Sequence, residues 1–196
     1  MIAPALPVVV LATTLAAAPE AETTPAHPDV VVPAAHGLAV MTVMRAVETV
    51  IWPEPFARPG LFAESWKRAF TEPPLFDASQ PFFRWDGDPL LVNVGGHALF
   101  GSELHLRART CRFGWATAFV FTAATSALWE YGFEANGVRP SALDLVYTPV
   151  AGLALGEARF QLWRAAGSLR PSAGRGALRA ILDPLGELER AAGTRC

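Results

Sequence analysis

The chain has 196 residues and a formal net charge of −2, with 52% hydrophobic and only 17% charged residues. This length is sufficient for one domain with a sizeable core, and the composition is poorer in charge than that of an average soluble domain, in which about 25% of residues are charged. The net charge and the scattered arginines exclude a typical nucleic-acid-binding protein, because such proteins present a basic face.

The first segment, residues 1–18, is apolar and contains no charged residue. An apolar stretch that ends in small residues is typical of a secretory signal, with cleavage near Ala17 or Ala18. It departs from that pattern because no Lys or Arg follows Met1. Residues 19–32 are rich in proline, threonine and acidic side chains, which predicts a linker. We therefore predict an exported protein, periplasmic or associated with the envelope membrane, with a single helical domain over 33–196.

The predicted elements that follow are helical. We expect a first helix over about 34–52, which Trp52-Pro53 ends. Residues 53–92 carry seven prolines and many aromatic side chains. They predict irregular chain packed over the bundle, with one helix over 62–70.

Three longer helices come next, and each has a terminal signal. Asn93 is a candidate N-cap for a helix over about 94–112, and Asn136-Gly137 ends a second helix over about 115–135. Ser141 caps a third helix that continues to about 166, with a kink expected at Pro149. Asp183-Pro184 divides the remaining helical pattern into two short helices. The fold class is therefore all-α, a compact bundle of about four to six helices with a Pro/aromatic-rich irregular segment.

The pattern of charges does not decide whether the helices contact a membrane. Residues 113–129 form a stretch of seventeen uncharged residues, which is the lower limit for a transmembrane helix. Gly152 and Gly156 form a small-xxx-small pair that allows close helix packing in a membrane or in water. Two interpretations remain: a short-helix bundle in or against a membrane, or an exported bundle with one fully buried central helix.

Polar side chains lie at helical spacing inside these apolar segments. His97, Gly101 and His105 share one face of the predicted 94–112 helix, and Arg109 extends that face. Ser126, Glu130 and Glu134 share a face of the next helix. An inward carboxylate needs a partner, because an unpaired buried charge costs several kcal/mol. His97 and Arg109 are the expected partners.

From this pattern we predict a cluster of His97, Glu130 and Asp144. Imidazole and carboxylate ligands suit a divalent metal such as zinc or manganese, and a carboxylate beside a histidine also suits acid–base catalysis. The surrounding network is expected to include Asn93, Arg109, Ser126, Glu134, Ser141 and Glu157.

Each residue also has a purely structural interpretation. Asp144 would serve as a helix cap, Glu134 would solvate a helix end, and His105 would be a surface residue. Cys111 and Cys196 have no neighbours at metal-ligand spacing, so we expect them to be functionally silent. Whether they pair is left open.

Several short motifs occur in an order that resembles a known bacterial family. They lie in "WDGDPLLVNVGGHALFGSELHLRART", in "SALWEYGFEANGVRPSALDLVYTPVAGLALGE" and in "ILDPLGELER". The chain resembles domain of unknown function family 3943 over about 82–190. It departs from that family at Ala98, where proline is expected, and at His105, where an aromatic is expected. The order of His, Glu and Asp on successive helices is also distantly similar to that of VanZ-type membrane proteins. The resemblance implies an exported or envelope-associated helical protein and no particular activity.

Two functions are consistent with the sequence, which leaves enzymatic activity open. The first is a non-enzymatic, envelope-associated bundle whose buried polar network holds short helices together around a lipid or a protein partner. The second is an envelope enzyme, a metal-assisted or acid–base hydrolase or transferase. It would act on a lipid- or glycan-linked substrate, with His97, Glu130 and Asp144 at its centre.

Overall fold

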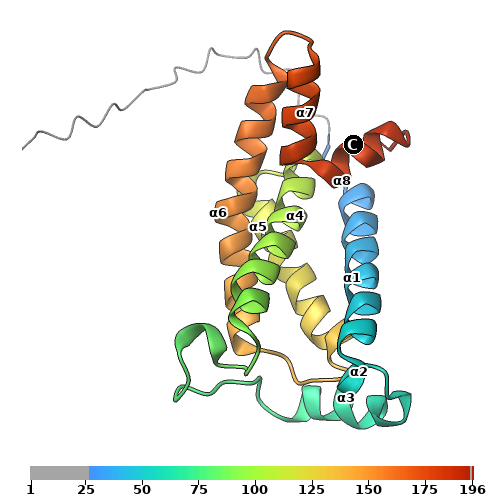
Figure 1. Ribbon diagram of the computed structural model, residues 1–196, viewed down its shortest axis with the longest axis vertical. Coiled ribbons are helices and arrows are strands. Elements are labelled where there is room, and N and C mark those ends of the chain that lie inside the picture. The colour runs from blue at the N-terminus through green and yellow to red at the C-terminus, as the bar shows by residue number, and fades with distance from the viewer. Residues whose placement is uncertain (1–26, 195) are drawn as a thin grey trace, which may run out of the picture.

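The computed structural model describes residues 27–194 and 196, and it confirms the all-α fold. Four long helices form the bundle: α1 (Val31–Ile51), α4 (His97–Thr110), α5 (Trp115–Leu128) and α6 (Ala142–Gly167). They run roughly parallel to one long axis (Figure 1). The central helix α4 packs against each of the other three. Within the described residues no β-strand forms, and one isolated bridge joins Leu75 to Ser141.

Short elements close the two ends of the bundle (Figure 1). At one end lie α2 (Pro53–Phe56), α3 (Phe62–Thr71) and the 3-10 turns Pro59–Leu61 and Phe82–Arg84. At the other end lie α7 (Ala173–Leu182) and α8 (Pro184–Ala191). We call these the α2/α3 end and the α7/α8 end.

The closest helix contact is between α4 and α6, and it depends on glycine. A Cβ atom added to Gly101 would lie 2.2 Å from the backbone oxygen of Thr148, and one added to Gly152 would lie 2.6 Å from the backbone carbon of Gly101. A Cβ on Gly156 would lie 2.7 Å from His105 Cβ. The predicted Gly152/Gly156 pair therefore forms the surface on which α4 lies. This close approach brings polar groups of α4 within reach of α6.

Two of the predicted helix caps are confirmed, and one is wrong. The Ser141 side chain accepts from the Asp144 backbone N–H at 3.1 Å, and Asp183 accepts from the Gly186 N–H at 3.0 Å. Asn93 caps no helix, because Leu91–Gly96 is itself a π-helical turn that continues directly into α4. Its side-chain amide is used elsewhere, as described below. Pro149 lies inside α6, which continues on both sides of it.

The uncharged stretch 113–129 does not form a single α-helix of that length. The helix there is divided into α5, of 14 residues, and a π-helical turn, Trp129–Glu134. Among the described residues, α1 is the one helix long and apolar enough to cross a membrane, by length and composition. Its two charged residues, Arg45 and Glu48, are half-buried. An apolar helix near the N-terminus is also compatible with a signal sequence.

The remaining predictions concern the chain ends and the aromatic segment. The predicted signal-like segment 1–18 and most of the linker 19–32 lie outside the described residues, and α1 begins at Val31 within that linker range. In the Pro/aromatic-rich segment, Phe76 and Phe82 both pack edge-on against Trp85. Cys111 and Cys196 form a disulfide with a Cα–Cα distance of 4.8 Å, at the α7/α8 end.

Candidate functional site

Three side chains predicted to form a cluster converge at the α2/α3 end. One potential ligand atom from each of His97, Glu130 and Asp144 lies within 4.8 Å of the others. The exposed fractions of the three residues are 6%, 1% and 2%. We call these residues the His–Glu–Asp cluster. Its members come from three separate parts of the chain, so the fold and not local sequence creates it.

Helix termini and π-helical turns place the three residues. His97 is the first residue of α4, Glu130 lies in the π-helical turn after α5, and Asp144 lies in the first turn of α6. A π-helical turn shifts the face that a side chain presents, and such turns occur often at functional sites. The "WEYGFE" turn directs Glu130 inward, while Glu134 lines a neighbouring cavity.

The histidine is oriented by one contact on each ring nitrogen. His97 Nδ1 hydrogen-bonds Thr148 Oγ1 at 2.9 Å, and Nε2 lies 3.5 Å from Asp144 Oδ2. Because Thr148 occupies the Nδ1 side, Nε2 is the nitrogen that faces the carboxylates. A ligating histidine is commonly held in this way, by a polar group on its other nitrogen.

The carboxylates are incompletely satisfied. Glu130 Oε2 accepts from the Ser141 backbone N–H at 2.7 Å, but Glu130 Oε1 and Asp144 Oδ1 are buried without a hydrogen-bond partner. Among the described residues, no lysine or arginine forms an ion pair with either carboxylate. Buried carboxylate oxygens without partners are costly, unless a proton or a cation compensates them.

Ser141 connects the cluster to a second layer of polar groups. Its hydroxyl donates to Asp86 Oδ2 at 2.6 Å while it accepts from the Asp144 N–H. Asn93 Nδ2 donates to Asp86 Oδ1 at 2.7 Å and to the Phe83 carbonyl at 3.0 Å. Asn93 and Ser141 thus belong to the network as predicted, and they tie the aromatic segment to the start of α6.

The two aspartates of the Asp-Gly-Asp turn differ in their electrostatic environment. Burial acts to raise the pKa of Asp86, but hydrogen bonds from Ser141, the Asp88 backbone and Asn93 outweigh it and hold the pKa below its usual value. Burial, and then the neighbouring charge of Asp86, raise the pKa of Asp88. Asp86 is therefore a persistent negative charge behind the cluster.

A cavity of about 250 Å³ reaches the cluster from the side of α1. Its polar lining consists of one histidine and four acidic residues: His97, Glu48, Glu54, Asp88 and Glu134. Trp129, whose buried indole N–H has no acceptor, also lines it. The rest of the lining is largely apolar, from Met44, Trp52, Pro55, Phe56, Val92 and Val138. His97 is the cluster residue that the cavity reaches.

Other predicted network residues lie elsewhere. Arg109 pairs with Glu157 at 2.8 Å, one of several ion pairs farther along α4, so it is not a partner of Glu130. His105 is fully buried and lies 3.2 Å from Glu157, so the surface interpretation of His105 is wrong. Ser126 donates to the backbone oxygen of Asp144 at 3.4 Å and so supports the first turn of α6.

Sequence reasoning missed Asp86 and Thr148, which both contact the predicted cluster residues or their supports. Asp86 lies in the segment 53–92, which the sequence predicts to be irregular. Thr148 precedes Pro149 one helical turn beyond Asp144, and that spacing could have placed it on the same face. Glu48 and Asp88, which line the cavity, were also missed, and no local pattern marks them.

These features define an all-α bundle with a buried His–Glu–Asp cluster at one end. Residues 82–185 match the family described as domain of unknown function DUF3943, which is more than half of the chain. The chain belongs to this family. The matched region contains the whole His–Glu–Asp cluster and ends five residues before the boundary expected from the sequence. No curated protein and no solved structure matches the chain.

Proposed function

We propose that this protein is a helical bundle of the cell envelope that binds one divalent metal ion in the His–Glu–Asp cluster. The observation that carries the proposal is the convergence of three buried ligand atoms within 4.8 Å, two of the contributing carboxylates having an oxygen without a hydrogen-bond partner. A bound cation would compensate both carboxylates at once. It would also join the starts of α4 and α6 to the turn after α5.

The ligand set favours particular metals. Imidazole nitrogen suits zinc and other late divalent ions, whereas carboxylate oxygen suits manganese and magnesium. One histidine with two carboxylates therefore fits Zn²⁺ or Mn²⁺, and three protein ligands leave a coordination position for water or substrate. The Ser141 and Thr148 hydrogen bonds supply the outer support that metal ligands usually have.

Metal content of the purified full-length protein tests this proposal. We expect about one equivalent of zinc or manganese in the wild type and a loss of at least tenfold in Glu130→Gln, because that variant keeps the shape but removes a charged ligand. Glu134→Gln is the matched control, one helical turn away and outside the cluster, and it should retain the metal. Absence of metal from the wild type after incubation with either ion would refute the proposal.

Envelope association rests on two properties of the chain. Its composition is strongly apolar, and α1 is an apolar helix near the N-terminus. In the envelope, the metal and its polar network would mainly hold the starts of α4 and α6 and the turn after α5 together. The bundle held in this way could bind a lipid or a protein partner. Salt washing of isolated membranes, followed by detection of the protein, tests whether the association is stable.

A second candidate is favoured by the cavity. Because the cavity reaches His97, a small ligand could approach the metal from outside, as a metal-assisted hydrolase or transferase requires. Cobalt-substituted protein tests this: azide should change the visible absorption spectrum if an open coordination position is accessible. Val138→Trp, which narrows the cavity, should abolish the change while the metal stays bound. A spectrum that azide leaves unaltered in the wild type would favour the structural role.

A further inference from the structure

The outward face of α1 is apolar along its whole length. Ten of its residues are exposed, and nine of them are apolar: Val31, Ala35, Leu38, Ala39, Val43, Ala46, Val47, Val50 and Ile51. The tenth, Thr42, donates its hydroxyl to the Leu38 carbonyl at 2.7 Å, so its polar group is satisfied within the helix. The Thr42 hydroxyl is therefore the one polar side-chain group on this face of α1, and it is already hydrogen-bonded within the helix.

The ionisable residues of α1 are buried or half-buried. His36 is buried and contacts Glu103 and Glu189. Arg45 donates to Asn136 Oδ1 at 2.8 Å and to the Phe133 carbonyl at 3.1 Å. A helix of a water-soluble bundle shows the opposite arrangement, with its apolar stripe facing the core and its charges facing solvent.

The other outer helices also have apolar side chains on their exposed faces. The exposed large side chains of α5 are Trp115, Val120 and Leu128, and those of α6 up to residue 158 are Val146, Val150 and Leu155. No Asp, Glu, Lys or Arg is exposed on α1, α4 or α5, or on α6 before residue 159, within the described residues. We call the joint outer surface of α1, α5 and this part of α6 the apolar belt.

Beside its apolar core, the interior of the bundle buries many polar groups, and those of α4 lie in the part of the helix nearer the α7/α8 end. The central helix α4 buries Ser102, Glu103, His105 and Arg107. Its charges are paired within the bundle: Arg159 with Glu103 at 2.8 Å, Arg107 with Asp183 at 3.3 Å and Arg109 with Glu157 at 2.8 Å. Ionisable residues inside membrane proteins are typically placed in this way, facing the interior and paired with one another.

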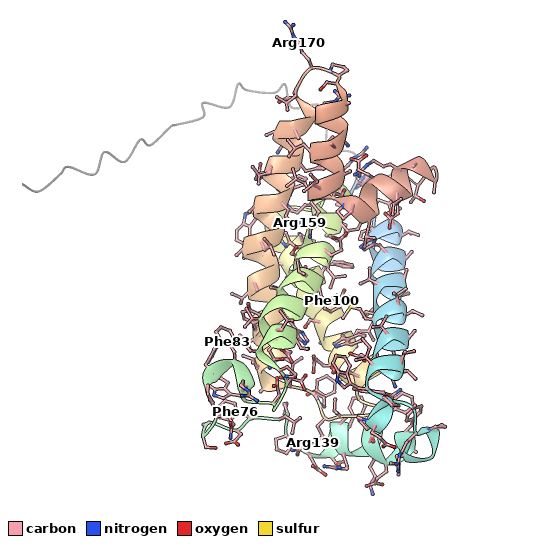
Figure 2. The ribbon with its side chains drawn as sticks, in the orientation of Figure 1. Phe76, Phe83, Phe100, Arg139, Arg159 and Arg170 are labelled. Carbon is pink, nitrogen blue, oxygen red and sulfur yellow. A yellow bond between two sulfur atoms is a disulfide. The ribbon has the colours of Figure 1, made fainter. Side chains whose placement is uncertain are left out.

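Within the described residues, exposed charge is confined to the two ends. Arg170 is exposed at the tip of the α7/α8 end, and Lys67 and Arg84 are exposed at the α2/α3 end, where the half-buried Arg139 also lies (Figure 2). The belt lies between them. The 21 residues of α1 correspond to about 31 Å at 1.5 Å per residue, and the hydrocarbon core of a bilayer is about 30 Å thick.

From this arrangement we propose that the apolar belt is immersed in the acyl chains of a lipid bilayer, so that the four-helix bundle crosses the membrane. Lipid fits better than a protein partner because the belt lies on opposite sides of α4. The helix α1 covers one side and α6 the other (Figure 1). One partner or a second copy would cover one side, whereas lipid covers both at the same depth. The proposal is independent of metal binding.

Spin-label accessibility in vesicles tests the belt directly. Full-length protein would be placed in phosphatidylcholine–phosphatidylglycerol vesicles, with single labels at Val43, Val120 and Val150 introduced as cysteines in separate variants. Labels at Lys67 and Arg170 are the matched controls from the two ends. The paired Cys111 and Cys196 remain unlabelled.

We expect the three belt labels to be at least fivefold more accessible to oxygen than to a water-soluble nickel chelate, and the two control labels to show the reverse. Protein that remains monomeric and soluble without lipid or detergent, with the belt labels exposed to nickel, would overturn the proposal. Belt labels that are shielded from both reagents would also overturn it, because they would show a protein partner or a second copy over the belt.

Discussion

The two ends of the bundle bury the same kinds of side chain but balance their charges differently. At the α7/α8 end, Glu103 pairs with Arg159 and His36, while Asp183 pairs with Arg107 and Arg190. At the α2/α3 end, Glu130 and Asp144 have no arginine or lysine partner among the described residues, and each has a carboxylate oxygen without a hydrogen bond.

This difference separates a structural network from a binding site. Where arginines supply the compensating charge, nothing further is needed, and the network fixes the packing of α4, α6 and α8. Where no arginine or lysine supplies that charge, a bound cation would complete the arrangement, as we propose for the His–Glu–Asp cluster. Burial of titratable groups therefore does not identify the site by itself; the missing countercharge does.

The largest effect is expected from removing an arginine at the α7/α8 end. Arg159→Met leaves Glu103 buried with His36 alone, and breaking a buried pair costs about 3 kcal/mol or more. Unfolding measured in detergent should show this loss. The double variant Arg159→Met/Glu103→Gln should recover most of it. An equal loss in the double variant would show that packing, and not charge balance, is responsible.

Reduction of the disulfide should come next. The Cys111–Cys196 bond closes a loop with a sequence separation of 85 residues at the same end, and native disulfides typically contribute about 2–4 kcal/mol. A reducing agent, or Cys196→Ser, should lower the midpoint of thermal unfolding accordingly. Metal content at the opposite end should not change, and its loss on reduction would contradict the separation of the two ends.

Metal removal should destabilise the α2/α3 end by an amount that depends on the concentration of free metal before removal. A ligand present at 100 times its dissociation constant stabilises the folded state by about 2.7 kcal/mol. EDTA should therefore lower the thermal midpoint of the wild type and of Glu134→Gln, while leaving Glu130→Gln unaffected. A fall of the same size in all three proteins would argue against binding by Glu130.

In the presence of EDTA, the change in unfolding free energy caused by Glu130→Gln should be opposite in sign to that caused by Arg159→Met. It removes a buried charge that lacks a countercharge, so the free energy of unfolding should be unchanged or higher by about 1 kcal/mol. Denaturant titration with chelator present measures this. A loss above 2 kcal/mol would mean that the carboxylate is compensated by the protein alone, which would remove the contrast between the ends.

The smallest effect concerns the pH dependence of Asp86. Its pKa is lower in the folded state than the ordinary value of 3.8, so its contribution to stability is fully present above that value. The contribution is lost as the pH falls through the folded pKa. The difference in unfolding free energy between the wild type and Asp86→Asn should therefore shrink below about pH 4. A difference that grows on acidification would show that folding raises the pKa of Asp86 and does not lower it.

Much of this arrangement follows from sequence, and the exceptions have physical causes. The spacing of His97, Gly101 and His105 correctly predicted that they share one face of α4, and the structure shows that this face meets α6. Terminal signals correctly placed Ser141 and Asp183. The two π-helical turns could not be predicted, because they depend on tertiary packing and not on local propensity. They are the reason that Asn93 is not a cap and that Glu130 and Glu134 diverge.

Partner choice was harder to predict than position. Arg109 was expected as a partner for an inward carboxylate, but helix spacing gives the direction of a side chain and not its depth along the bundle. Glu157 lies at the same depth along the bundle as Arg109 and forms the ion pair with it. The role of Asp86 likewise depends on a long connection folding back onto the start of α6.

The position of the disulfide bears on the compartments that the two ends would meet. Disulfides persist where thiols are not kept reduced, as outside the cytoplasm. In a bilayer-spanning bundle, the α7/α8 end carrying Cys111 and Cys196 would therefore face the oxidising side. The His–Glu–Asp cluster, at the other end, would draw its ion and any small ligand from the opposite compartment.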